Sequence, residues 1–292
     1  MKTNEEKQLV TQALETLASA IGRGESEQLK AYLAMLGRFH RYSVGNVLLI
    51  AMQRPGATRV AGFRTWQKLG RQVKEGEKGI RILAPIVWRK KKEKQEGKDD
   101  EDEELVRFRS VCVFDVAQTD GKPLPEFAQA RGEPGEYTGK LMQFATEQGI
   151  EVELSGQLGS AQGLSAGGKI LVRKGLPPAE EFSVLAHELA HELMHRGGEE
   201  KPGSRTVRET EAEAVAFVVC QAIGLEAVNA AADYIKLYQG NKETLLESLQ
   251  RIREAAVQII GAIVRKEPEQ ARGCETELLG TDAGEHQAAR AA

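Results

Sequence analysis

The chain has 292 residues, which is long enough for two domains that each bury a core of their own. Its composition, with 41% hydrophobic and 28% charged residues, is typical of globular proteins and excludes collagen-like or low-complexity chains. There is no apolar run of transmembrane length, no signal-peptide pattern at the start and no CxxC pair among the three cysteines. We therefore expect a cytoplasmic protein without a membrane partner.

The two halves of the chain differ in charge. Residues 1–125 carry 23 Lys and Arg against 17 Asp and Glu, whereas the remainder carries 17 basic and 26 acidic residues. This asymmetry indicates two modules with different partners.

The first module, residues 1–125, is predicted to be helices followed by a small antiparallel sheet. Apolar residues at spacings of three and four predict helices over 4–21 and 26–39, and a third helix from about Ser43 to the break at Pro55. Two β-type runs at 80–88 and 105–116 flank the highly charged segment 89–104, which reads as the solvated tip of a long hairpin.

The second module, residues 138–266, follows a Gly- and Pro-rich linker over 126–137. It is predicted to be mainly helical with a small sheet, so the fold class is α+β. Strands are expected over 150–154 and 169–173. Helices are expected over 138–148, 179–196, 205–225, 229–238 and 242–266. The polar tail over 267–292 is predicted to be disordered.

The strongest motif is HExxH, formed by His187, Glu188 and His191. Two histidines four residues apart on a helix project from one face and can bind one metal ion. Glu188 lies beside them, where a carboxylate can take a proton from a water molecule at the metal. We expect Zn²⁺, with Mn²⁺ or Co²⁺ able to use the same ligands.

A third protein ligand is expected from the next helix, as in gluzincins. Glu211 lies within an otherwise apolar stripe of that helix and is the preferred ligand, with Glu213 as the alternative. Glu209 fits a solvated surface acid better. His195 is two turns away from His187, about 12 Å along the helix, and is expected outside the set of ligands.

A basic segment in the first module indicates nucleic-acid binding. Between residues 54 and 92 there are twelve Lys and Arg and only two acids, with aromatic residues interleaved. Basic side chains contact phosphates and exposed aromatic rings stack on unpaired bases, although each aromatic could equally be a core residue. The candidate DNA-binding residues are Arg59, Arg64, Trp66, Lys68, Arg71, Lys74, Lys78 and Arg81.

Both halves resemble plasmid-borne antirestriction proteins of the ArdC type. The first resemblance rests on YSVGNVLLIAMQRPGATRVAGFRTWQKLGRQVKEGEKGIRILAPI and VFDVAQTDGKPLP, and the second on LAHELAHELMH and ETEAEAVAFVV. It implies a single-stranded-DNA-binding domain followed by a zincin-like metallopeptidase domain, the latter more distantly similar to ImmA/IrrE peptidases. In that family an acid of the second motif completes the metal site, and the matching position is Glu211.

The resemblance implies a protein that binds single-stranded DNA and protects incoming plasmid DNA from host restriction during conjugation, with a host protein as a further candidate substrate. Two alternatives stay open. One is a DNA-binding module whose zinc site is structural or idle, and the other is a DNA-dependent metalloprotease acting on DNA-bound or regulatory proteins. Glu188 argues against an idle site, because a structural zinc site needs no general base.

Overall fold

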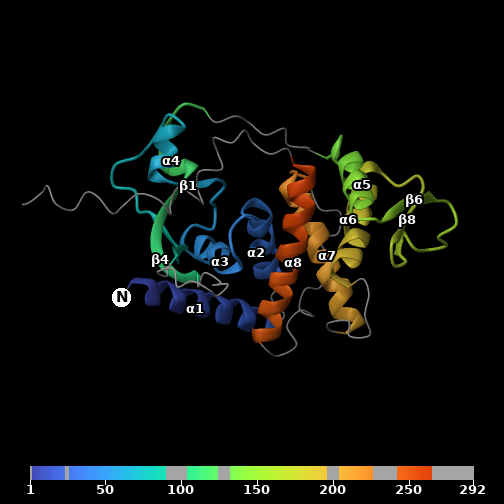
Figure 1. The fold of residues 1–292 in the computed structure, drawn as a ribbon, viewed down its shortest axis with the longest axis horizontal. Coiled ribbons are helices and arrows are strands. Elements are labelled where there is room, and N and C mark those ends of the chain that lie inside the picture. Colours follow the sequence, from blue (N-terminus) through green and yellow to red (C-terminus); the bar gives the residue numbers. More distant parts are fainter. Residues whose placement is uncertain are drawn as a thin grey trace, which may run out of the picture.

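The computed structural model describes residues 2–23, 26–89, 104–123, 132–195, 204–225 and 242–264. Over these residues the chain is an α+β structure, as predicted, with helices in the middle and small sheets toward both ends (Figure 1). The expected helix over 229–238, the tail over 267–292 and most of the charged segment 89–104 lie outside the described residues. None of the helices within the described ranges is long and apolar enough to cross a membrane.

Three helices open the chain, and they confirm the helices predicted there. They are α1 (Lys2–Gly22), α2 (Ser26–Arg38) and α3 (Val44–Gln53). Ser43 caps α3, because its side chain accepts a hydrogen bond from the backbone N–H of Asn46 at 3.3 Å. The helix stops before Arg54, since a residue that precedes a proline is disfavoured in the helical region.

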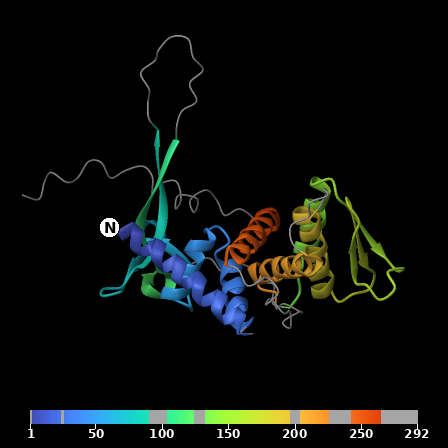
Figure 2. The ribbon, with the colours of Figure 1, turned by 90° about the horizontal axis from the view of Figure 1, so that it is seen from below.

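The first sheet has the strand order β1-β4-β3. Its strands are β1 (Val60–Gly62), β3 (Ile80–Arg89) and β4 (Glu104–Asp115). β3 and β4 pair antiparallel from Ile80 opposite Val113 to Arg89 opposite Glu104, which confirms the predicted strand pair. The two strands extend away from the helices as an arm (Figure 2).

Side-chain amides of α3 cover the outer edge of β3. Asn46 donates to the carbonyl of Leu83 at 2.8 Å and accepts from its N–H at 2.9 Å. Gln53 makes the same pair of hydrogen bonds with Arg81, at 2.8 and 2.9 Å. An edge strand leaves backbone groups unpaired, and here two amides take the place of a further strand. The sheet is thereby fixed to the helices.

A small unit beside β1 contains four of the eight predicted DNA-binding residues, namely Arg64, Trp66, Lys68 and Arg71. It consists of α4 (Phe63–Lys68), β2 (Arg71–Val73), the 3-10 turn η1 (Val116–Gln118) and β5 (Thr119–Gly121), with β2 antiparallel to β5. The buried carboxylate of Asp115 accepts hydrogen bonds from the backbone N–H groups of Thr58 and Arg59, at 2.8 and 3.1 Å. These bonds fix the loop that leads into β1.

Within its described residues, the second half of the chain holds a three-stranded sheet and four helices. In chain order they are α5 (Tyr137–Glu147), β6 (Glu151–Ser155), β7 (Gly163–Ser165), β8 (Lys169–Arg173), α6 (Pro178–His195), α7 (Arg205–Ala222) and α8 (Lys242–Ile263). The strand order is β6-β8-β7, with β6 parallel and β7 antiparallel to β8. Only β7 was not predicted, because three residues carry too little pattern.

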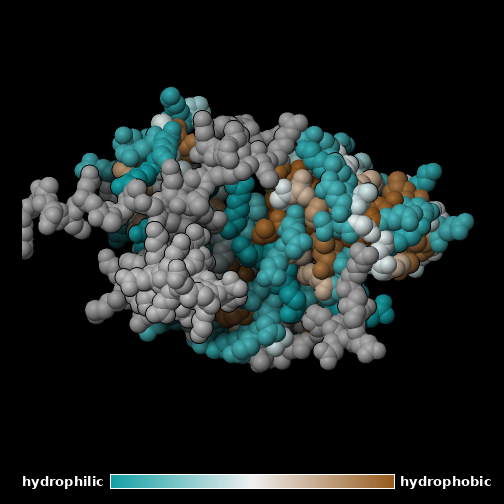
Figure 3. All heavy atoms as spheres, viewed as in Figure 1, coloured by the Kyte–Doolittle hydropathy of each residue, from teal (hydrophilic) through white to brown (hydrophobic). Residues whose placement is uncertain are grey.

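This sheet lies at one end of the molecule, where hydrophobic residues are visible on the surface (Figure 3). Leu154 of β6 and Leu164 of β7 are 43% and 48% exposed. On its other side the sheet packs against α6, which carries the HExxH motif.

Helices of both halves contribute to one continuous hydrophobic core. α2 packs against α7, and Gly37 permits the close crossing, because a Cβ there would lie 2.9 Å from the carbonyl oxygen of Val218. Arg253 of α8 donates a hydrogen bond to the carbonyl of Tyr42 at 2.6 Å. The helices that surround the HExxH motif are therefore supported by helices of the first half, as their neighbouring positions in Figure 1 show.

Candidate metal centre

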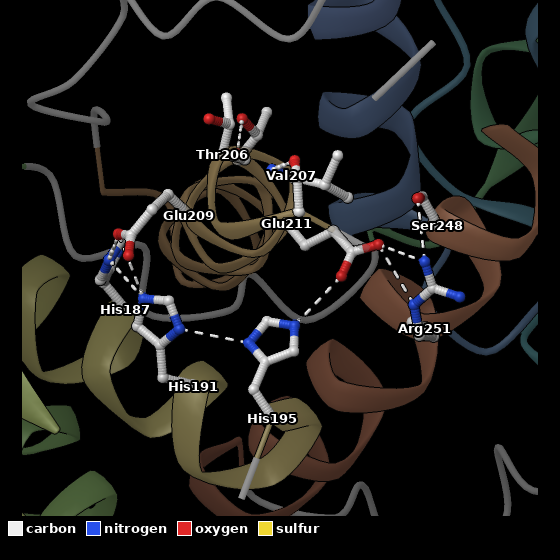
Figure 4. Close-up of polar contacts among 11 residues, drawn as sticks. His187, His191, His195, Thr206, Val207, Glu209, Glu211, Ser248 and Arg251 are labelled. Atoms are coloured by element: carbon white, nitrogen blue, oxygen red, sulfur yellow. Dashed lines mark hydrogen bonds and ion pairs between the residues drawn. The ribbon is translucent and has the colours of Figure 1, made fainter. Parts of the chain in front are cut away.

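Helix α6 presents His187 and His191 on one face. The opposite face is apolar and fully buried, including Leu185 and Leu189, so packing fixes the rotation of the helix. The two Nε2 atoms lie 3.1 Å apart and point toward the same region (Figure 4). Two imidazole nitrogens at this separation can bind a single metal ion.

The third group beside these histidines is Glu209 of α7. Its Oε2 lies 3.4 Å from Nε2 of His191 and 3.7 Å from Nε2 of His187. Among the residues that the structure describes, only these three form a His, Cys, Asp or Glu group that could hold a metal, with donor atoms all within 4.8 Å of one another. The structure thus places Glu209, which the sequence suggested to be a surface acid, at the position expected for Glu211.

Glu211 lies elsewhere, in a buried ion-pair network. Its side chain is fully buried, and its Oε1 accepts hydrogen bonds from Nε and Nη2 of Arg251 on α8. Its Oε2 lies 3.1 Å from Nε2 of His195. Burial of a carboxylate requires a partner, and here Arg251 is that partner.

Glu213 contacts His187 from outside the metal position. Its Oε2 lies 3.3 Å from Nδ1 of His187, on the side of the ring away from Nε2. A carboxylate here orients the imidazole and favours the tautomer whose Nε2 is free to bind a metal. The residue predicted as the alternative ligand therefore contacts a ligand instead.

His195 lies close to the second histidine. Its side chain is buried, and its Nδ1 is 3.2 Å from Nδ1 of His191. It does not belong to the group of three residues that can share an ion. The spacing along the helix had suggested this position outside the ligands.

Glu188 is buried between α6 and the edge strand β7. A Cβ on Gly163 would lie 2.6 Å from Oε1 of Glu188, so glycine is needed for this close approach. The carboxylate lines a pocket of about 210 Å³ together with Gln162, Gly163, Ser183, Val184, His187 and Glu213. The carboxylate of Glu188, the imidazole of His187 and the edge of β7 therefore meet in one pocket.

A second buried carboxylate on α6 holds β7 in place. Glu192 accepts hydrogen bonds from Oγ of Ser165 at 2.6 Å and from the backbone N–H groups of Gly167 and Gly168 at 2.9 and 2.8 Å. It thereby fixes the turn between β7 and β8 to the helix. Sequence reasoning missed this residue, since no local pattern distinguishes it from a surface glutamate.

The two histidines of the motif differ in their titration behaviour. Burial, and then the neighbouring His187, lower the pKa of His191 to about 4, which keeps the ring neutral as a ligand must be. Burial opposes a charge on His187, but its hydrogen bond to Glu213 and nearby carboxylates raise its pKa overall. Burial also raises the pKa of Glu188, which brings this carboxylate nearer to the range of a general base at neutral pH.

The predicted DNA-binding residues divide into exposed and structural groups. Arg64, Lys68, Lys74 and Lys78 are exposed, whereas Arg59, Arg71 and Arg81 are half-buried. Arg71 holds β5 through hydrogen bonds to the side chain and carbonyl of Thr119, at 2.7 and 2.8 Å.

Two further residues differ from the expectation of free contact with DNA. Nζ of Lys74 donates to the carbonyl of Ala117 at 3.1 Å, and Arg81 pairs with Glu5 at 3.4 Å. Both are tied to protein groups.

Trp66 also differs from the expectation of base stacking. The residue is only 2% exposed, and its Nε1 donates a hydrogen bond to the carbonyl of Phe114 at 2.9 Å. Its ring is a core element, since helix α4 turns this face inward. Phe63 of the same helix is 46% exposed and takes the role of the accessible aromatic.

Comparisons with known proteins agree with both halves of this description. A model of the N-terminal domain of anti-restriction factor ArdC matches residues 7–116, and a model of the IrrE N-terminal-like domain matches residues 145–255. The chain thus carries an ArdC-type N-terminal domain followed by an IrrE-like domain.

Relatives of this ArdC-type chain are distant in sequence. The uncharacterised protein pXO2-81 of Bacillus anthracis is 26% identical over 275 residues, which cover 79% of this chain and 47% of that protein. The chain thus spans about half the length of the curated relative it matches.

Crystal structures of the antirestriction protein ArdC from plasmid R388 are also similar. Its Mn(II)-bound structure is 18% identical, covers 89% of this chain and 99% of that chain, and has a TM-score of 0.53. Its metal-free structure is 19% identical, covers 77% and 85% of the two chains, and has a TM-score of 0.47. The likeness to the Mn(II)-bound structure establishes a shared fold.

Proposed function

We propose that this chain is an antirestriction protein that binds single-stranded DNA and protects incoming plasmid DNA from host restriction during conjugation, in the cytoplasm. Residues 1–125 bind the DNA, and residues 138–266 form a zinc metallopeptidase domain. The observation that carries the second assignment is the convergence of His187, His191 and Glu209 beside Glu188. The match of residues 7–116 to the ArdC N-terminal domain supports the first.

The exposed face of α4 supports DNA binding. Phe63, Arg64 and Lys68 are all exposed on this short helix, and Leu69 follows at 38% exposure. An accessible aromatic ring beside two basic groups can stack on a base while the basic groups contact neighbouring phosphates. The arrangement suits a flexible single strand, because only unpaired bases offer their faces for stacking.

The donor set fits a divalent metal ion. Two imidazole nitrogens and one carboxylate oxygen, with the remaining side open to the pocket, are the ligands of a catalytic zinc site. Mn²⁺ or Co²⁺ can use the same donors. When bound, such an ion supplies Lewis acidity to a carbonyl oxygen of the substrate.

Glu188 and β7 supply the other elements of a peptidase site. Gln162 accepts a hydrogen bond from Arg173, and Ala166 donates to Lys169, so these alternate residues direct their backbone groups toward β8. Gly163 and Ser165 then direct theirs away from β8. The N–H of Ser165 forms a hydrogen bond with Glu188, and the backbone groups of Gly163 lie where an extended peptide can pair. Glu188 lies at this edge, where its carboxylate can accept a proton from an attacking water and return it to the leaving amine.

The peptidase assignment is tested with Glu188→Gln, which keeps the size of the side chain but removes the base. We expect Zn²⁺ binding to persist while cleavage of a mixed peptide library falls by about 100-fold or more. Glu181→Gln, on the first turns of the same helix, is the matched control. Equal cleavage by the wild type and Glu188→Gln would leave only an idle or structural metal site.

The role of cleavage in antirestriction is tested in recipient cells. Transfer efficiency of a plasmid that carries restriction sites is compared for cells expressing the wild type and Glu188→Gln. If protection is unchanged by the substitution, DNA binding alone accounts for it. If protection is lost while DNA binding is retained, a host protein is the substrate that matters.

A further inference from the structure

Beyond the metal site itself, a line of buried polar side chains connects three helices behind His191. We call it the His195 chain, and it consists of His195 on α6, Glu211 on α7 and Arg251 on α8. Figure 4 shows these side chains in sequence, ending at the ring of His191 on the side away from Glu209. None of them lies within the group of residues that can share the metal.

The direction of each hydrogen bond follows from the arginine end of the chain. A guanidinium group can only donate, so Arg251 donates to Oε1 of Glu211 through two of its nitrogens. The carboxylate of Glu211, which accepts both of these hydrogen bonds, is ionised and can only accept hydrogen bonds. Nε2 of His195, which lies 3.1 Å from Oε2 of Glu211, must therefore carry a hydrogen and donate it.

The remaining bond fixes the tautomer of the metal ligand. When His195 is neutral its ring carries one hydrogen, so its Nδ1 is an acceptor once Nε2 is the donor. Nδ1 of His191, at a distance of 3.2 Å, must then donate. This leaves Nε2 of His191 with its lone pair, and that is the atom beside Nε2 of His187 and Oε2 of Glu209.

We propose that the His195 chain sets the tautomer and orientation of His191 and thereby tightens metal binding. The inference rests on the proposed metal site, and it assigns His195 and Glu211 as positioning residues. The corresponding role at His187 belongs to Glu213, which contacts Nδ1 of that ring directly. The three acids of α7 thus have different roles. Glu209 faces the metal, Glu211 orients His191 through His195, and Glu213 orients His187.

This division follows from helix geometry. Residues two apart on a helix differ by about 200° in direction, whereas residues four apart differ by about 40°. Glu209 and Glu213 therefore lie on one side of α7, and Glu211 lies on the other, toward α8 (Figure 4). An ion pair with Arg251 is available only on that second side.

The test measures metal affinity and ring tautomer in parallel. His195→Leu removes the acceptor for His191, and we expect its affinity for Zn²⁺, measured against a chelating dye, to fall by about 10-fold to 100-fold. His195→Gln keeps one acceptor and one donor and should recover most of the affinity. Leu249→Ala, which removes buried apolar atoms from α8, controls for a general loss of stability, and we expect its affinity to stay within about twofold of the wild type.

The second readout needs no metal. Long-range proton–nitrogen NMR correlations of the metal-free, isotope-labelled protein report which nitrogen of His191 carries the hydrogen. We expect Nδ1 in the wild type and in His195→Gln, and a mixture of tautomers in His195→Leu. Unchanged affinity and tautomer in His195→Leu would overturn the His195 chain while leaving the metal site intact. A wild type that binds neither Zn²⁺, Mn²⁺ nor Co²⁺ would overturn the metal site, and the NMR result alone would then show whether the tautomer is set as described.

Discussion

Oε2 of Glu209 lies 3.4 Å from Nε2 of His191. The two residues are 18 positions apart in the chain and belong to two helices that cross, α7 and α6. In the proposed site, this contact places the metal between α6 and α7. It also decides between three acids of one short segment that carry equal charge and differ only in direction.

The first prediction concerns the third ligand. Glu209→Ala should weaken Zn²⁺ binding by more than the range of about 10-fold to 100-fold that is usual for residues outside the ligand set. Competition with a chelating dye gives the affinity, and Glu254→Ala, an exposed glutamate on α8, serves as the control. Normal binding by Glu209→Ala together with lost binding by Glu211→Ala would restore Glu211 as the ligand.

The second prediction concerns the buried ion pair of Arg251 and Glu211. Arg251→Met leaves a fully buried carboxylate without its guanidinium partner and should lower the free energy of unfolding by about 3–5 kcal/mol near neutral pH. Replacing both residues, as Arg251→Met with Glu211→Leu, should recover much of this loss. Denaturant unfolding with excess chelator measures the change, and a double variant no more stable than Arg251→Met would contradict it.

The pH dependence of this pair has a defined sign. Burial tends to raise the pKa of Glu211, but hydrogen bonds from His195, Arg251 and Ser248 lower it overall from 4.5. The native state therefore binds fewer protons than the unfolded chain, and the stabilisation is complete above 4.5 and lost as the pH falls through the lowered pKa. In Arg251→Met the lone carboxylate takes up a proton more easily, so its deficit in unfolding free energy should shrink on acidification.

The third prediction concerns two cysteines of different reactivity. Cys112 is exposed, whereas Cys220 is fully buried and burial raises the pKa of its thiol to about 12. Because the thiolate is the reactive form, iodoacetamide near neutral pH should modify Cys112 in the native protein and Cys220 only after unfolding. Peptide mass mapping distinguishes the sites, and fast native labelling of Cys220 would show that α7 opens.

The fourth prediction concerns the exposed face of α4. Phe63→Ala should weaken binding of single-stranded DNA by about 1–3 kcal/mol with little change in salt dependence, because stacking involves no counterions. Arg64→Ala should instead reduce the slope of log affinity against log salt by about 0.7, the value for one phosphate contact on a single strand. Lys174→Ala, an exposed lysine of the second half, is the control. Equal affinities and slopes for all three variants would remove α4 from the DNA interface.

Local features of this protein could be predicted because they depend on neighbours in the chain. The spacing of His187 and His191 fixes their common direction on any helix, and the apolar residues of α6 fix which face is exposed. The helices other than α4, the strand pair β3–β4 and the α+β class followed from similar patterns. The edge strand β7 escaped prediction, since three residues give no periodicity and its position depends on Glu192.

The third ligand could not be predicted from the same patterns. The helical wheel identified Glu211 as an acid on an apolar face of α7. The structure confirms this position, because Glu211 is fully buried. The wheel carries no information on which neighbouring helix lies there, and the neighbour is α8 with Arg251. Likewise, the basic and aromatic composition of the first half drew attention to Trp66 and Phe63 equally, and only the packing of α4 exposes the second and buries the first.

The sequence by itself thus determined the two domain families, the fold class and the two histidines with their neighbouring base, because motif spacing and periodicity are properties of a single helix or strand. The tertiary structure alone decided which of the acids at 209, 211 and 213 lies beside Nε2 of both histidines, which pairs with an arginine and which contacts Nδ1 of His187. Those roles depend on the crossing of α6, α7 and α8, and that crossing is set by packing between residues far apart in the chain.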